Sequence, residues 1–61
     1  MSDDQEVTRV RLYQDEQGLW RWVAFMAAGL AVQDSEQGWE HWGDCRDAAV
    51  GAFPGAELVE G

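Results

Sequence analysis

Four tryptophans and four arginines are the residues of this chain best suited to binding chemistry. Trp20 and Trp22 lie two positions apart, with Arg21 between them. Residues two apart on a strand share a face, so the two indoles could stack on nucleobases while arginines contact phosphates. The alternative is that both rings pack beneath a helix and supply buried area to a small core. We favour packing, because a chain with a net charge of −8 repels phosphate.

The arginines cluster early in the chain, at Arg9, Arg11 and Arg21. Their guanidinium groups could clamp an anion through paired hydrogen bonds. More often such arginines pair with nearby acids, here Asp15 or Glu16, and cover apolar surface with their stems. The candidate binding residues are therefore Trp20, Arg21, Trp22, Arg9 and Arg11.

His41 and Cys45 are the next pair with chemical potential, because residues four apart on a helix share a face. A cysteine and a histidine can serve a nucleophile or a metal. No third orienting group accompanies them, and an isolated buried cysteine behaves as a small hydrophobe. Phosphate-binding glycine loops and calcium-loop spacings are also missing from the sequence. We therefore expect no catalytic residue, no metal site and no cofactor, and predict that the protein is not an enzyme.

Trp39 and Trp42 flank the predicted start of a helix. Large aromatic residues are enriched where subunits meet, so the two rings could form a seam with a second subunit. They could equally close one end of the protomer's own core. With the apolar residues of a short C-terminal strand, they make up the candidate dimer interface: Trp39, Trp42, Ala56, Leu58 and Val59.

Alternation of apolar and polar residues predicts the strands that must position these groups. In the first strand, Thr8, Val10 and Leu12 point one way, and Arg9 and Arg11 point the other. Glycines at positions 18 and 29 favour turns. A helix over residues 22–32 is the local alternative, which Gly29 disfavours because it interrupts the run. The predicted strands cover residues 7–13, 19–26, 30–34 and 56–59.

From about His41 the apolar spacing becomes helical, and the helix ends before Pro54. Asp44 is either its N-cap or an acid that favours the positive end of the helix dipole. The resulting element order is βββαβ, which predicts an α+β domain with an antiparallel sheet packed against one helix. Residues 1–6 read as a disordered acidic tail and residues 7–61 as the domain.

A chain of 61 residues has room for one domain, which buries only about 60% of the surface that its unfolded form exposes. Cys45 is the only cysteine, so an internal disulfide is impossible. One histidine and one cysteine cannot form a four-ligand structural zinc site. Self-association is the remaining source of stability, so we expect a homodimer.

Twelve acids stand against four arginines, and no lysine is present. Repulsion among the acids is relieved in concentrated salt, where the Debye length falls to about 3 Å at 1 M. This composition resembles that of proteins from halophilic archaea, and an ordinary acidic protein without lysine is the alternative. Hydrophobic residues make up 46% of the chain, which argues against disorder. No apolar run could cross a membrane and no signal peptide is visible, so we expect a cytoplasmic protein.

Several short runs resemble the YegP-like family of unknown function, also called UPF0339, and indicate a single-repeat member from a haloarchaeon. They are Leu12-Tyr13-Gln14-Asp15, Gly18-Leu19-Trp20-Arg21-Trp22, Ala28-Gly29 and Asp34-Ser35-Glu36-Gln37-Gly38-Trp39.

The resemblance implies paired βββαβ units that share one sheet and exchange their C-terminal strands, with no established reaction. We therefore predict a structural or protein-interaction module that acts as a homodimer in a high-salt cytoplasm and whose partner, besides itself, is another protein. A nucleic-acid or nucleotide-binding accessory is the alternative.

Overall fold

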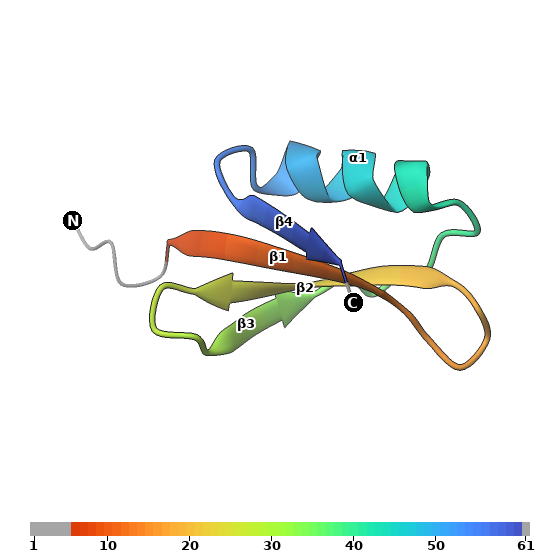
Figure 1. Ribbon diagram of the computed structural model, residues 1–61, viewed down its shortest axis with the longest axis horizontal. Helices are drawn as coiled ribbons and strands as arrows, with labels where there is room; N and C mark the ends of the chain where they lie inside the picture. The colour runs from red at the N-terminus through yellow and green to blue at the C-terminus, as the bar shows by residue number, and fades with distance from the viewer. Residues whose placement is uncertain (1–5, 61) are drawn as a thin grey trace.

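The computed structural model describes residues 6–60, which form one sheet and one helix (Figure 1). The α+β class and the βββαβ order are confirmed, and the alternative helix over residues 22–32 is wrong. Of the predicted acidic tail, residues 1–5 lie outside the described residues, and Glu6 is exposed. The elements are β1 (Val7–Gln14), β2 (Trp20–Met26), β3 (Ala31–Asp34), α1 (Trp42–Ala52) and β4 (Glu57–Glu60).

The four strands form a mixed sheet in the order β3-β2-β1-β4. β1 and β2 are antiparallel, as are β2 and β3, whereas β4 runs parallel to β1. The predicted purely antiparallel sheet is therefore wrong at its last strand. The reason is topological: β3 has the same direction as β1, and α1 returns the chain to the end where both begin. A strand that follows such a crossover pairs in parallel.

The core lies between α1 and one face of the sheet, which the helix covers (Figure 1). Alternate residues of the two central strands meet Cys45 and Ala49 of the helix. Phe53, just after the helix, contacts the Trp22 ring edge to face, with 5.3 Å between ring centroids. The buried hydrophobic residues are Val10, Leu12, Trp22, Ala24, Cys45 and Ala49.

An irregularity in the pairing of β1 with β2 changes which side chains face the core. The register shifts between Val7 and Arg9, where the pairing of β1 with β2 is irregular. Beyond this shift Val7 packs against the core and Thr8 is exposed, so the prediction that Thr8 points the same way as Val10 is wrong. An extra residue reverses the alternation of a strand, which explains the change.

Both predicted glycine turns are present. Gly18 (φ 82°) and Gly29 (φ 93°) adopt the left-handed region that glycine reaches without steric cost. Gly29 N–H donates to the Met26 carbonyl at 2.8 Å, which closes the turn between β2 and β3.

Helix α1 begins after His41, whose backbone is extended and whose side chain makes no capping hydrogen bond. Asp44 lies in the first turn, so it acts on the helix dipole rather than as the N-cap. At the other end the Phe53 N–H donates to the Ala49 carbonyl at 2.9 Å.

Candidate functional site

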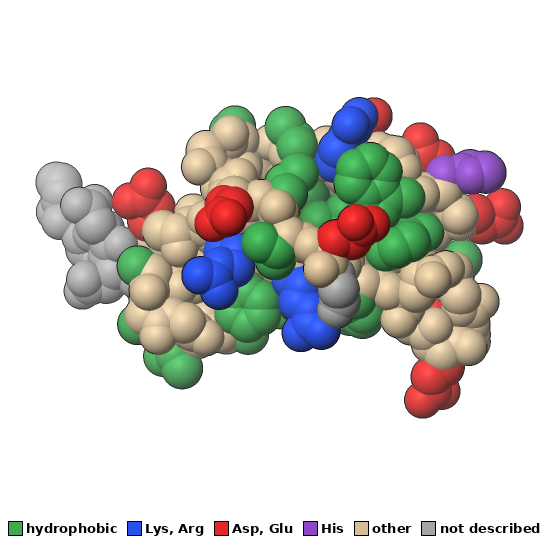
Figure 2. All heavy atoms as spheres, in the orientation of Figure 1, with side chains coloured by type: hydrophobic (Ala, Val, Ile, Leu, Met, Phe, Trp, Pro, Cys, Tyr) green, Lys and Arg blue, Asp and Glu red, His purple; other side chains and the backbone are tan. Residues whose placement is uncertain are grey.

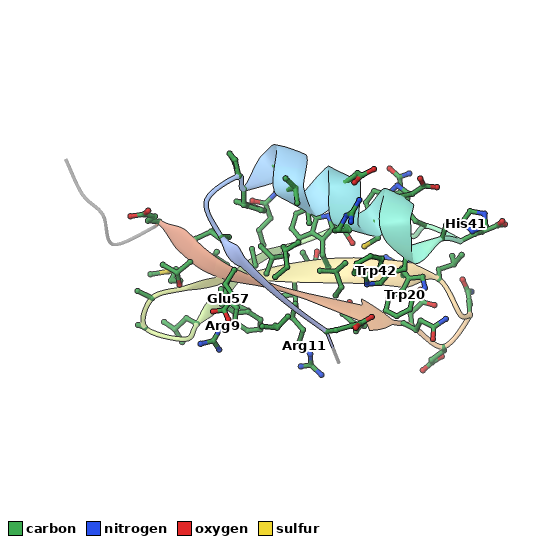
Figure 3. The ribbon with its side chains drawn as sticks, turned by 45° about the horizontal axis from the view of Figure 1, so that its top comes forward. Arg9, Arg11, Trp20, His41, Trp42 and Glu57 are labelled. Carbon is green, nitrogen blue, oxygen red and sulfur yellow. The ribbon has the colours of Figure 1, made fainter. Side chains whose placement is uncertain are left out.

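The sheet face opposite the helix carries three of the four arginines. Residues on β1 and β2 that alternate with the buried ones point to this side, and register places residues of β3 and β4 beside them. Figure 3 shows Arg9 and Arg11 pointing away from the helix, with Glu57 next to Arg9. We call this surface the open face: Arg9, Arg11, Tyr13, Arg21, Val23, Phe25, Asp34, Glu57 and Val59.

Arg21 forms an ion pair with Asp15, with 2.6 Å between Nε and Oδ2. The other oxygen of Asp15 accepts hydrogen bonds from the N–H groups of Gln17 (2.8 Å) and Leu19 (3.0 Å). The hydrogen bond from Arg21, followed by that from Leu19, lowers the pKa of Asp15, and the same bond raises the pKa of Arg21. The expectation that an arginine pairs with Asp15 is therefore confirmed for Arg21.

The pairing of the Asp15 carboxylate with Arg21 leads us to expect that the folded chain loses stability at low pH. The pKa of Asp15 in the folded chain is below the unfolded value of about 3.9. The stability that the Asp15 carboxylate contributes is therefore fully present above pH 3.9 and is lost as the pH falls through the folded pKa. We expect Asp15→Asn to melt at a lower temperature than the natural chain at pH 6, and the difference to shrink as the pH is lowered below 3.9. Thermal unfolding followed by circular dichroism between pH 2 and 6 measures this.

The control is Glu16→Gln, which removes one negative charge from the neighbouring, exposed position. The melting temperature of Glu16→Gln should stay close to that of the natural chain at every pH. An Asp15→Asn curve parallel to the natural one would contradict the assignment.

The two indoles of the predicted stacking surface lie on the helix side of the sheet, opposite the arginines. Trp22 is only 6% exposed, and its ring packs against Phe53. Its Nε1 is buried with no hydrogen-bond partner among residues 6–60. Trp20 is half-buried, and its backbone exchanges hydrogen bonds with Trp39 at 2.6 and 2.9 Å. Packing beneath the helix is thus confirmed for Trp22, which is too deeply buried to stack on a nucleobase.

The predicted interface residues do not form one continuous surface. Trp39, Ala56 and Leu58 are half-buried and pack against the protomer's own core. Trp42 is 37% exposed, and the Arg46 guanidinium lies 5.3 Å from its ring centroid. Val59 pairs with Arg11 and so belongs to the open face. Trp39 therefore closes one end of the core, which was the second of the two roles considered for it.

His41 and Cys45 do not form a reactive pair. The Cys45 side chain is fully buried, and burial raises the pKa of its thiol, which disfavours the nucleophilic thiolate. His41 is exposed and points away from the body of the molecule (Figure 3). Within residues 6–60, no group of three His, Cys, Asp or Glu side chains is placed to hold a metal ion.

A broad groove of about 750 Å³ lies between α1 and the segment that follows β3. Trp22, Trp39 and Ala48 supply its apolar lining, and Gln33 to Gln37 supply its polar lining. Ser35 is buried beside the groove, where its Oγ accepts a hydrogen bond from the backbone N–H of Trp22 at 3.1 Å. Sequence reasoning missed this groove, because the residues that line it come from three separate segments without a shared motif.

The described residues thus define a small α+β domain with one helix-covered face and one open face. None of its described helices has the length and apolar character needed to span a bilayer. No protein-family model, curated protein or solved structure matches the chain. The resemblance to the YegP-like family stays a prediction.

Proposed function

We propose that the chain is a small, non-enzymatic structural or protein-interaction module that acts as a homodimer in a high-salt cytoplasm, with its two βββαβ units sharing one sheet. The observation that carries this proposal is the exposure of β3, which lies at one edge of the sheet. All four of its residues are exposed, and Val32 and the adjoining Leu30 are 47% and 64% exposed. An uncovered edge strand with apolar side chains is a template for pairing with another chain.

The small core supports the same proposal. Only six hydrophobic residues are buried within the described part of the chain. Domains of this size usually draw stability from a disulfide, a metal or a partner subunit. Cys45 is the sole cysteine, so a partner subunit is the source that best fits this sequence.

Two joins produce a shared sheet. In the first, the β3 strands of two copies pair edge to edge while each β4 stays on its own β1. In the second, which the resemblance implies, the copies exchange β4, so that the partner's strand takes the place opposite residues 9–12 of β1. Ala56, Leu58 and Val59 of the predicted interface would then lie between chains.

The nucleic-acid alternative has less support. Trp22 is buried, and Trp20 lies on the side of the sheet opposite Arg9, Arg11 and Arg21. Phosphates approaching those arginines would also meet the carboxylates of Asp34 and Glu57. We therefore give protein partners precedence over nucleic acid.

Val32→Lys tests the proposal and separates the two joins. Sedimentation of the natural chain in multimolar KCl should give at least twice the 6.8 kDa of the monomer. We expect Val32→Lys to weaken self-association by at least tenfold, because a lysine on an edge strand opposes further pairing. Val50→Lys is the matched control, since Val50 is 42% exposed on the helix and should tolerate the same change.

Each result has a defined meaning. Loss of association in Val32→Lys alone supports the join through β3. Unchanged association in both variants supports the exchanged join through β4. A well-folded monomer of the natural chain at high salt and high protein concentration would overturn the proposal of a homodimer.

A further inference from the structure

The groove between α1 and the segment that follows β3 has no role in the proposed function. Its volume of about 750 Å³ lies within the range of about 300–1,000 Å³ that is typical of small-ligand sites. Trp22, Trp39 and Ala48 supply apolar surface, and Gln33 and Gln37 supply amide groups. Small-ligand sites use this combination to bury a ligand and to fix its orientation.

The charge of the lining favours a cation. Two of the lining residues are acids, Asp34 and Glu36, and none is an arginine or a histidine. The chain as a whole has a net charge of −8. The potential in the groove is therefore negative, which raises the local concentration of cations and lowers that of anions. A bare metal ion fits poorly, because within residues 6–60 no three His, Cys, Asp or Glu side chains are placed to hold one.

The indole of Trp39 selects an organic cation over an inorganic one. Trp39 is half-buried, so it presents more of its ring than the buried Trp22 does. The face of a tryptophan ring attracts an ammonium group, and methyl groups on the nitrogen bury apolar area against the ring at the same time. Concentrated salt screens charges but strengthens the burial of apolar surface. An alkylated ammonium ion therefore keeps part of its affinity where potassium ions are abundant.

One contact of this kind exists within the chain. The Arg46 guanidinium lies 5.3 Å from the centroid of the Trp42 ring, within the distance of about 6 Å at which a cation and an aromatic ring attract each other. Figure 2 shows a basic side chain beside hydrophobic ones over α1. Trp42 thus has a cation from its own helix, whereas no arginine lines the groove beside Trp39. The groove is therefore a place where an external cation fits.

Trp22 adds an unused hydrogen-bond donor to the wall of the groove. Its side chain is 6% exposed, and its Nε1 has no hydrogen-bond partner among residues 6–60. A buried donor without an acceptor is destabilising, because the N–H has lost its contact with water. A ligand oxygen that entered beside Trp22 would supply the acceptor.

We propose that this groove binds an alkylated amino alcohol, a small ammonium ion that carries methyl groups on its nitrogen and a hydroxyl nearby. The cation lies against Trp39 and Glu36, and the hydroxyl oxygen lies toward Trp22. The inference goes beyond the proposed function and does not require a second copy, because one chain supplies the whole lining.

Choline is the probe, because it joins a trimethylammonium group to a hydroxyl. NMR of the isotope-labelled natural chain in multimolar KCl should show saturable shifts of the Trp22 and Trp39 indole N–H signals, while the Trp42 signal stays in place. The neutral isostere of choline, in which carbon replaces nitrogen, should bind at least fivefold more weakly. Equal affinity for the two probes, or no saturable shift with choline, would overturn the inference.

Two pairs of variants assign the binding to the groove. Trp39→Leu removes the ring, and Trp42→Leu makes the same change outside the groove. Glu36→Gln and Glu40→Gln each remove one charge from an exposed position, so both change the general attraction of the protein for cations equally. Trp39→Leu should weaken choline binding at least fivefold and Glu36→Gln about twofold, with smaller effects in the two controls.

Equal effects within either pair, in variants that circular dichroism shows to be folded, would contradict the placement of the cation. If Trp39→Leu does not fold, the comparison of choline with its isostere on the natural chain decides the question. Sedimentation of the same samples reports separately on the homodimer. Choline binding by a monomer would leave this inference standing, and a dimer that does not bind choline would leave the proposed function standing.

Discussion

Trp22→Ala should abolish the folded state. Trp22 lines the centre of the core, is 6% exposed and contacts Phe53 edge to face. Truncation of a buried Trp or Phe to alanine costs about 3–5 kcal/mol. A domain of 61 residues has a total stability of about 3–9 kcal/mol at typical values per residue. One truncation therefore removes most of the free energy of unfolding.

Far-ultraviolet circular dichroism and urea titration in multimolar KCl measure this effect. Trp42→Ala is the control, because it makes the same change at a position that is 37% exposed and outside the core cluster. Trp22→Phe should be much milder, since it retains an aromatic ring and removes the buried Nε1 that has no partner among residues 6–60. A cooperative transition for Trp22→Ala close to the natural midpoint would contradict the described core.

Removal of salt should produce the second large effect. Two like charges about 10 Å apart repel by about 0.4 kcal/mol in water, and twelve acids on a small surface form many such pairs. The Debye length is about 10 Å at 0.1 M and about 3 Å at 1 M, so concentrated salt screens them. We expect the melting temperature to fall by about 10–20 °C between 2 M and 0.1 M KCl, which corresponds to a few kcal/mol.

A variant with fewer charges separates screening from the general strengthening of hydrophobic burial by salt. Glu16→Gln/Glu36→Gln/Glu40→Gln neutralises three exposed acids. Its melting temperature should depend less steeply on KCl than that of the natural chain, when both are followed by circular dichroism. Equal slopes for the two proteins would remove the physical basis of the high-salt hypothesis.

The sequence predicted the elements well because local signals agree with the final packing. Gly18 and Gly29 occupy the left-handed turns predicted for them, and the helix begins after His41 as its spacing indicated. No strand bound differs from its prediction by more than one residue. The apolar alternation of β1 and β2 correctly placed Val10 and Trp22 on the core side.

Non-local features were predicted less well. The direction of β4 depends on how α1 crosses the sheet. The residue types within β4 do not indicate this direction. The register shift near Thr8 arises from pairing with β2 and leaves no local signal. The two acids of the open face, Asp34 and Glu57, are placed there by register, which brings them beside β2 and β1. Of the candidate binding residues, the arginines share that face, whereas Trp20 and Trp22 lie on the other.

The parallel pairing of β1 with β4 has a consequence for the order of folding. Val10 lies opposite Leu58, so this contact joins the two ends of the described chain, whereas β1, β2 and β3 are linked by short turns. Contacts distant in sequence form later than local ones. Until β4 arrives, one edge of β1 stays open to the β4 of any chain nearby. For the proposed exchange of β4, we therefore expect the protein concentration during folding to set the proportion of closed and exchanged chains.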